Sequence, residues 1–287
     1  MKILVTGAAG FIGYFTAVKL LERGDTVVGL DNFNDYYDVS LKEARAKRLD
    51  SYDNFSMRRI DLADRSAMEK LFANESFQKV VHLGAQAGVR YSIDNPHAYI
   101  DSNIVGTLHI LEGCRHHGIE HLVFASSSSV YGANTSMPYS IHHNVDHPLA
   151  LYGATKKSNE LMAHSRDFTY IDDIVEGVVR SLDNTAAANE QWDAASPDPA
   201  SSKAPYRIYN IGNQKPVELM RFIELIEENV GKKAQMNMLP MQAGDVPDTW
   251  ADASDLADAV GYAPNTSIEV GVKQFVEWYL AYYKDKP

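Results

Sequence analysis

The chain has 287 residues, of which 45% are hydrophobic, and its formal net charge at pH 7 is −11. This length suits one large domain or a large and a small one, and the acidic balance argues against nucleic acid and anionic membranes as general partners. Cys114 is the one cysteine, so no internal disulfide is possible, which fits a cytoplasmic location. The chain starts directly with a core strand and has no apolar run of transmembrane length, so neither a signal peptide nor a membrane span is expected.

A β-α-β unit is predicted at the start of the chain. Residues 3–5 form a short apolar run typical of a buried parallel strand. Glycines follow at positions 7, 10 and 13, and apolar residues then recur every three or four positions, which indicates a helix. Residues 26–30 form a second strand that ends at Asp31.

Each glycine of this turn has a physical role in binding a dinucleotide. Gly7 permits the tight turn out of the strand, Gly10 lets backbone N–H groups approach a pyrophosphate, and Gly13 lets the helix pack close to the sheet. The helix N-terminus adds N–H donors and a partial positive charge. Asp31 is placed to accept both ribose hydroxyls of an adenosine, where a 2′-phosphate would meet its charge, so NAD is predicted rather than NADP.

The next elements continue the alternation of helices and strands. Residues 41–49 and 66–72 are predicted helices, and residues 55–60 and 79–83 are predicted strands. Asp61, just past the third strand, either binds the adenine amino group or caps the following helix, and the sequence leaves both interpretations open.

Two stretches of small residues follow the fourth and fifth strands. The first, GAQAGVRYS, includes Arg90 and lies where a backbone borders the ligand crevice of a doubly wound sheet. Residues 97–116 are predicted to form one long helix, and residues 121–125 the fifth strand. The four serines at positions 126–129 follow that strand, so their hydroxyls are predicted to point into the same crevice.

A tyrosine and a lysine on the next predicted helix suggest acid–base chemistry. Tyr152 and Lys156 are four residues apart, so they share one helix face. A lysine ammonium next to a phenol favours the phenolate, which makes Tyr152 a plausible acid or base near neutral pH. The histidines in the preceding polar stretch lack the ordered spacing of metal ligands, so no metal is predicted.

These motifs together resemble a known family. The segments GAAGFIG, SSSSVYG and YGATK, with Asp31, are similar to those of the extended short-chain dehydrogenase/reductase family. More narrowly, DNFNDYYDVSLKEAR, QAGVRYS, NVDHPLALYGATKKSNE and RDFTYIDDIVEGVVR resemble UDP-glucuronate 4-epimerases. The resemblance implies a Rossmann-type, doubly wound parallel α/β sheet with a smaller C-terminal α/β substrate lobe. It also implies NAD as cofactor, a UDP-sugar as substrate, C4 epimerisation through a 4-keto intermediate, and a homodimer.

The resemblance also assigns roles to residues. Ser127 matches the catalytic hydroxyl, Tyr152 the base and Lys156 its partner. The implied cofactor-binding residues are Gly7, Gly10, Phe11, Ile12, Gly13, Asp31, Asn32, Asp61, Leu62, Leu83, Ala85, Tyr152 and Lys156. The implied substrate-binding residues are Arg90, Ser127, Ser128 and Tyr152.

Other activities of the same fold differ at the serine run. Ser128 and Ser129 stand where sugar-nucleotide 4,6-dehydratases carry Asp-Glu and where related decarboxylases carry a Glu, so their identity favours simple epimerisation. A dehydratase or decarboxylase remains the nearest enzymatic alternative. A protein that binds NAD without catalysis is an alternative of another class.

A segment of the family is missing at the junction of Ser165 and Arg166. In the family, another core strand and a substrate-binding segment stand between the helix that bears Tyr152 and the sequence RDFTYIDD, whereas here no residue separates them. A parallel crossover needs a dozen or more residues. The printed sequence either joins the two sides of a longer chain or carries an internal deletion. We divide the chain there, into a nucleotide-binding domain, 1–165, and a substrate lobe, 166–287.

The lobe is predicted from short patterns. A short strand and a helix are expected in residues 166–182, an exposed loop in 184–205, and a strand in 207–211. The remaining predicted elements are helices at 216–230, 252–260 and 268–283 and a short strand at 236–239. The aromatic stripe near the end of the last helix is expected to pack internally or to form a dimer face.

Overall fold

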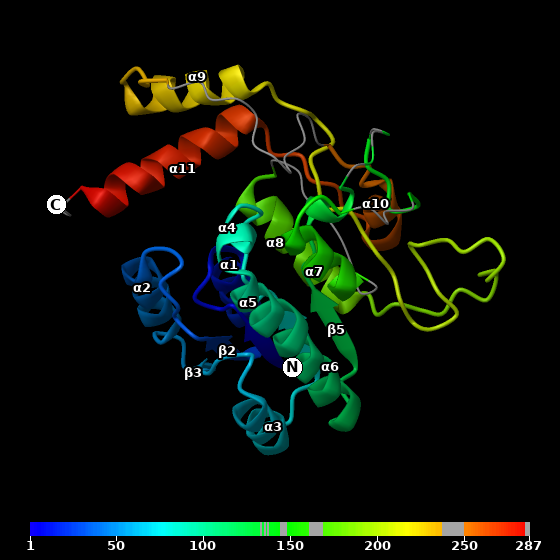
Figure 1. Ribbon diagram of the computed structural model, residues 1–287. Coiled ribbons are helices and arrows are strands. Elements are labelled where there is room, and N and C mark those ends of the chain that lie inside the picture. Colours follow the sequence, from blue (N-terminus) through cyan, green and yellow to red (C-terminus); the bar gives the residue numbers. More distant parts are fainter. Residues whose placement is uncertain are drawn as a thin grey trace.

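Five parallel strands form the centre of the protein in a computed structural model, shown in Figure 1. The structure describes residues 1–132, 134, 136, 138–143, 148–160, 169–236 and 250–284. The strands are β1 (Lys2–Thr6), β2 (Thr26–Asp31), β3 (Phe55–Arg59), β4 (Lys79–His82) and β5 (His121–Phe124). Their order is β3-β2-β1-β4-β5, so the chain reverses direction across the sheet after β3, next to β1. All five strands were predicted from the sequence, and the α/β Rossmann-type sheet is confirmed.

Alternate residues of β1 enter two separate cores, because side chains of a strand point to opposite faces. Ile3 and Val5 pack against α1 (Phe11–Glu22) and α8 (Ile171–Asp183). Leu4 packs on the other face, in a core shared with α3 (Arg65–Asn74) and α6 (Gly106–His116). All three side chains are fully buried, which explains why the strand reads as a continuous apolar run rather than an alternating one.

The long helix predicted for residues 97–116 is a continuous helical segment with an irregular turn inside it. It consists of α5 (Pro96–Tyr99), a π-helical turn η1 (Ile100–Val105) and α6. A shorter helix, α4 (Tyr91–Asp94), precedes it. A π-turn holds one more residue than an α-turn and is common at functional sites.

The remaining helices lie in both halves of the chain. The helix α2 (Val39–Leu49) follows β2, and α7 (Leu151–Glu160) carries Tyr152. The lobe contributes α9 (Leu219–Val230), α10 (Ser254–Val260) and α11 (Ile268–Tyr283). In Figure 1, α9 and α11 lie side by side at one end of the molecule. Among the described residues, no helix is both long and apolar enough to cross a membrane.

The predicted strand at 207–211 was wrong. Arg207 forms only an isolated bridge with Ser201, and residues 208–211 are irregular. An extended segment becomes a strand only when a neighbour supplies its hydrogen bonds, and the sheet of the described residues ends at β5. The segment instead uses the side chain of Asn210, which donates from Nδ2 to the Tyr139 carbonyl at 2.9 Å. The strands predicted near residues 166–168 and 237–239 lie outside the described residues.

Candidate functional site

The glycine turn after β1 leaves no room for side chains. Gly7 adopts φ +68°, and a Cβ there would lie 2.9 Å from the backbone nitrogen of Gly84. A Cβ on Gly13 would lie 2.1 Å from the Gly7 carbonyl oxygen. The turn is closed by the Gly10 N–H, which donates to that same oxygen at 2.8 Å. The turn therefore takes this shape only with glycine at these positions, and its backbone borders an open cavity.

That cavity, of about 240 Å³, lies at the carboxyl ends of β1, β2 and β4. Its walls include eight of the predicted cofactor-binding residues, namely Gly7, Gly10, Asp31, Asn32, Asp61, Leu62, Leu83 and Ala85. Five others, Phe11, Ile12, Gly13, Tyr152 and Lys156, do not line it. A cradle of glycine backbone at one end and a carboxylate at the other fits the pyrophosphate and the adenosine ribose of a dinucleotide.

Asp31 is held in place at the end of β2. Its Oδ2 accepts a hydrogen bond from the Ala9 N–H at 3.2 Å and its Oδ1 accepts one from the Phe33 N–H at 2.9 Å. Phe33 adopts φ +53°, a conformation that a bulky residue rarely takes. The buried Nζ of Lys42 lies 3.9 Å from Asp31 Oδ1.

The two interpretations of Asp61 can now be separated. The N-cap of α3 is Asp64, whose Oδ1 accepts from the Ala67 N–H at 3.0 Å. Asp61 is therefore not the cap. It accepts from Asn32 Nδ2 at 2.8 Å and from the Ala63 N–H at 2.8 Å, at the wall of the cavity.

A buried histidine, which the sequence did not single out, helps to hold the backbone that packs against the glycine turn. Thr6 Oγ1 accepts from the N–H groups of Leu83 and Gly84 at 3.1 and 2.9 Å. It therefore donates to His82 Nδ1, 2.7 Å away, which leaves His82 Nε2–H to donate to Thr107 at 3.1 Å. Burial lowers the pKa of His82 to about 3, so the ring is neutral and this arrangement is stable at physiological pH.

The helix with Tyr152 is fastened directly to the end of β5. Lys156 is buried and its Nζ donates to the Ala125 carbonyl at 2.8 Å. Burial lowers the pKa of Lys156 to about 8. Gly153 touches the serine turn, because a Cβ there would lie 2.6 Å from the Ser129 carbonyl oxygen. Ser127 is buried at the start of that turn, η2 (Ser128–Val130), and its Oγ accepts from the Ser129 N–H at 3.3 Å.

Polar side chains around Tyr152 hold α7 against the π-turn. Asn103 pairs with the Gln86 backbone through both its Oδ1 and its Nδ2, at 2.8 and 3.0 Å. Asn159 Nδ2 donates to the Asn103 carbonyl at 2.6 Å, and Thr155 Oγ1 lies 3.1 Å from Asn103 Nδ2. These contacts were not predicted, because they join three segments that no local pattern connects.

The predicted substrate residues are not all brought together. Ser127 and Ser128 stand at the start of η2, which packs on α7, the helix that carries Tyr152. Arg90 is exposed, at the position before α4. Two residues further on, Ser92 contacts α7, because its Oγ accepts from the Tyr152 N–H at 3.3 Å.

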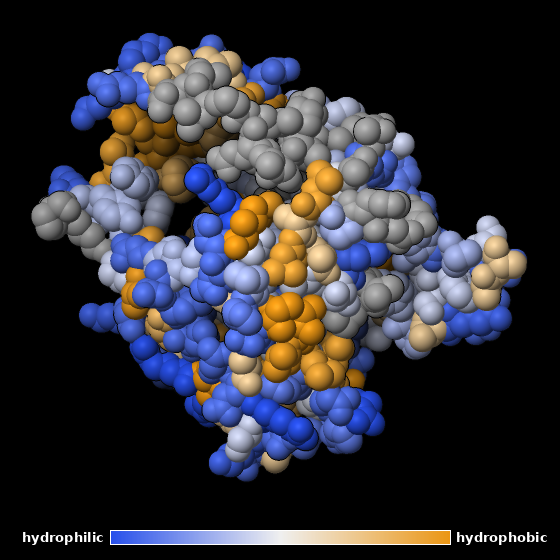
Figure 2. Space-filling view, viewed as in Figure 1, coloured by the Kyte–Doolittle hydropathy of each residue, from blue (hydrophilic) through white to orange (hydrophobic). Residues whose placement is uncertain are grey.

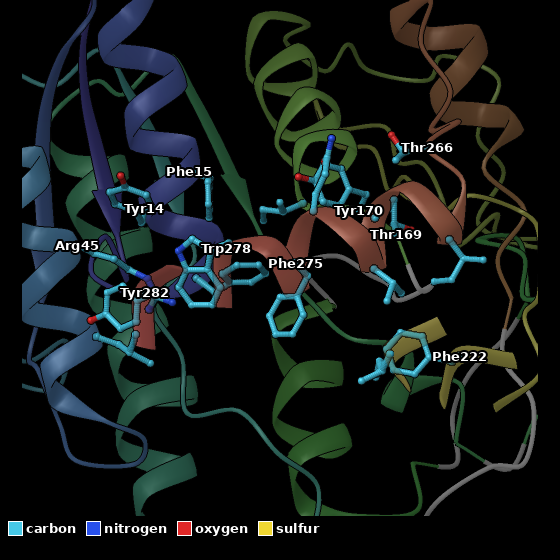
Figure 3. Close-up of a pocket in the computed structure, with 18 of the residues that line it drawn as sticks. Tyr14, Phe15, Arg45, Thr169, Tyr170, Phe222, Thr266, Phe275, Trp278 and Tyr282 are labelled. Atoms are coloured by element: carbon cyan, nitrogen blue, oxygen red, sulfur yellow. The ribbon is translucent and has the colours of Figure 1, made fainter. Parts of the chain in front are cut away.

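A second cavity, of about 480 Å³, is apolar and lies between α1, α2 and the lobe. Figure 3 shows Phe15 of α1 on one side, with Phe275, Trp278 and Tyr282 of α11 facing it. Figure 2 shows the same apolar lining as a hollow beneath α9. Phe11 is the one predicted cofactor residue that lines it. Its walls are mainly apolar, with the tyrosines Tyr14, Tyr170 and Tyr282 and the arginines Arg45 and Arg48 among the lining residues.

The parallel sheet, the glycine turn and the cavity beside Asp31 place the protein among the dinucleotide-binding proteins of the Rossmann type. The family model for GDP-mannose 4,6 dehydratase matches residues 4–165. The chain belongs to this family, within the extended short-chain dehydrogenases/reductases, which confirms the resemblance drawn from the sequence.

Individual relatives extend over nearly the whole chain. Protein CapI of Staphylococcus aureus is 47% identical, covering 99% of this chain and 100% of its own length. A probable UDP-glucuronate 4-epimerase of Rhizobium meliloti is 40% identical, covering 99% and 98%. Among solved structures, UDP-glucuronic acid 4-epimerase of Bacillus cereus, in complex with UDP-glucuronic acid and NAD, has a TM-score of 0.79. It is 27% identical and covers 97% of this chain and 100% of that chain.

The alignment with CapI also bears on the junction at 165/166. It extends over 334 positions, whereas this chain has 287 residues, so at least 47 positions have no counterpart here. The match to the family model ends at residue 165. Both observations agree with a segment missing at that junction, which lies outside the described residues.

Proposed function

We propose that the protein is an NAD-dependent UDP-sugar 4-epimerase that interconverts UDP-glucuronate and UDP-galacturonate. One structural observation carries the proposal. The Lys156–Ala125 hydrogen bond and the close approach of Gly153 to Ser129 bring Tyr152, Lys156 and Ser127 to the carboxyl end of β5. The UDP-glucuronate 4-epimerases among the relatives support the choice of substrate.

Each of these residues has a role in the proposed reaction. NAD, when bound, would supply reversible hydride exchange at C4 of the sugar, which passes through a 4-keto sugar. Tyr152 removes the proton of the C4 hydroxyl and later returns it, while Ser127 hydrogen-bonds the same oxygen. Lys156 supplies a positive charge that stabilises the phenolate. Gly7, Gly10, Asp31 and the other cavity residues hold the cofactor.

The serine run distinguishes this reaction from dehydration or decarboxylation. Ser128 and Ser129 offer hydroxyls where, by the resemblance, enzymes of those reactions carry carboxylic acids. The polar groups at the serine turn therefore suit reversible oxidation at C4 alone.

The missing segment favours a second candidate function, binding of NAD without turnover. The family segment at 165/166 supplies the walls that hold the UDP-sugar, whereas the cavity beside Asp31 is built from residues before the junction. Intact-mass spectrometry of the purified protein tests whether the deletion is real. A mass of 31.9 kDa would establish an internal deletion, and a larger mass would refute it. Conversion of UDP-glucuronate, followed by NMR, supports the epimerase, whereas NADH binding without any conversion supports the second candidate.

We further propose a cytoplasmic homodimer. Ile93 and Leu108 are 67% and 53% exposed, and Figure 2 shows apolar residues gathered over α5 and α6. Burial of this surface against a second copy would remove it from water. Light scattering after size exclusion tests the dimer, and substitution of Leu108 by Glu is expected to yield the monomer.

A further inference from the structure

A buried lysine lines the nucleotide cavity next to the predicted ribose site. Lys42, on α2, is only 4% exposed. Its Nζ donates to the Asn34 backbone carbonyl at 2.9 Å and to Asn34 Oδ1 at 2.7 Å, and it lies 4.7 Å from the centre of the Tyr37 ring. Asp31 Oδ1 is 3.9 Å away. The ammonium is thus within reach of whatever Asp31 binds.

The surrounding charges explain why a lysine is tolerated here. Burial of an ammonium is costly unless an anion and hydrogen-bond acceptors compensate it. Burial lowers the pKa of Lys42, while the carboxylate of Asp31 and, more weakly, that of Asp35 raise it. Arg45, the other nearby cation, donates instead to the Ala9 carbonyl and to the Tyr37 hydroxyl, at 3.2 and 3.3 Å. Asp31 is therefore the principal counter-charge of Lys42.

We propose that Lys42 is a specificity-determining residue that becomes a ligand for a 2′-phosphate once the charge of Asp31 is removed. The inference rests on the proposed NAD function, in which Asp31 accepts the ribose hydroxyls. In the native protein, the carboxylate repels a 2′-phosphate and balances the lysine. Without the carboxylate, a buried cation stands near the same ribose oxygens, and a phosphate dianion supplies the missing counter-charge.

The test compares the dissociation constants of NADH and NADPH, each measured through the fluorescence of the bound cofactor. The native protein is expected to bind NADH and to bind NADPH more weakly. Asp31→Asn is expected to tighten NADPH binding by roughly tenfold or more, the range of a charge-assisted hydrogen bond. The double variant Asp31→Asn/Lys42→Met is expected to lose that gain. Asp31→Asn/Lys47→Met is the matched control, because Lys47 is an exposed lysine on the same helix, and it should retain the gain.

Each outcome separates the inference from the function on which it rests. If the native protein fails to bind NADH, the proposed function is wrong. The inference is overturned if NADH binds but the NADPH affinity of the Lys42 double variant rises as much as that of the Lys47 control. It is also overturned if Asp31→Asn does not raise the NADPH affinity. Asp31→Ser, with and without Lys42→Met, keeps the test decisive if Asp31→Asn unfolds, because it also removes the charge of Asp31, and equal NADPH affinities of these two variants would contradict the role of Lys42.

Discussion

At the scale of single residues, the surroundings of Tyr152 leave its ring little freedom. The side chain is buried, packs edge-on against Tyr99 at 5.9 Å between ring centres, and has its backbone N–H bound to Ser92. This restraint suits the proposed role of Tyr152, because general acid–base catalysis needs a side chain positioned within reach of the proton it transfers.

Tyr152→Phe is expected to lower turnover by about 10²–10⁴-fold, the usual contribution of a positioned acid or base. The ring still packs, so NADH binding should persist. Turnover is measured as epimerisation by NMR, and cofactor binding is measured by NADH fluorescence. Tyr139→Phe is a suitable control, since this buried hydroxyl has no hydrogen-bond partner among the described residues. Turnover close to that of the native protein would remove Tyr152 from the mechanism.

The lowered pKa of Lys156 leads us to expect an upper pH limit for the reaction. Burial lowers its pKa to about 8, so the ammonium loses its charge as the pH rises through that value. Turnover is therefore expected to fall on the alkaline side with a midpoint near pH 8, and to be flat just below it. Lys156→Arg stays charged over this range, so the alkaline limb should disappear in this variant even if its turnover is lower. An unchanged limb would assign the titration to another group.

At the scale of elements, the site depends on how closely α7 approaches the serine turn. A methyl group at Gly153 would lie 2.6 Å from the Ser129 carbonyl oxygen, and that backbone cannot move without shifting Ser127. Alanine would improve the helix propensity of the position, so any loss of stability there must come from the contact.

Gly153→Ala is expected to lower the free energy of unfolding by about 1–3 kcal/mol through overpacking, and to lower turnover more than NADH binding. Thermal melting and the NMR assay measure these quantities. Gly271→Ala, in α11, is the control, because its nearest neighbour is the edge of the Tyr170 ring at 3.2 Å, which can yield. Full activity in Gly153→Ala would show that the spacing between α7 and η2 is not critical.

The elements also show what a sequence can and cannot predict. The five strands followed from apolar runs, and the cavity wall at Asp31 followed from its place after the second strand, because both are local patterns. Lys42 and Ser92 were missed, since their roles arise from contacts between α2 or α4 and distant segments. The strand at 207–211 was predicted from a short local pattern, although a strand also needs a neighbouring strand to supply its hydrogen bonds.

At the scale of the whole molecule, β5 is the edge of the sheet formed by the described residues. The residues of β4 are all buried, whereas those of β5 are only half-buried. The alignment with CapI has at least 47 positions without a counterpart in this chain, and the resemblance drawn from the sequence implies that a further core strand belongs among them. An edge with open hydrogen-bonding groups and apolar side chains favours association between chains.

Insertion of the corresponding CapI segment between Ser165 and Arg166 is expected to raise turnover strongly and to reduce aggregation. The inserted walls would hold the sugar, and such positioning contributes on the order of 7–11 kcal/mol in favourable cases. The native junction and the insertion variant are compared by the NMR assay and by light scattering. Comparable turnover in both would mean that the shorter chain builds a complete substrate pocket without the segment.

The π-turn at Ile100–Val105 makes the length of this helix as important as its composition. Because a π-turn holds one more residue than an α-turn, one residue deleted inside it would convert it to an α-turn and leave α5 and α6 in place. One residue deleted from the first two turns of α6 would instead rotate the rest of that helix by about 100°, and Gly113 would leave the Phe72 ring, where a Cβ would lie only 2.4 Å from a ring carbon. A deletion scan should therefore find a tolerated single-residue loss within residues 100–105 and none within residues 107–112, whereas substitution of the exposed Asp101 should be accepted.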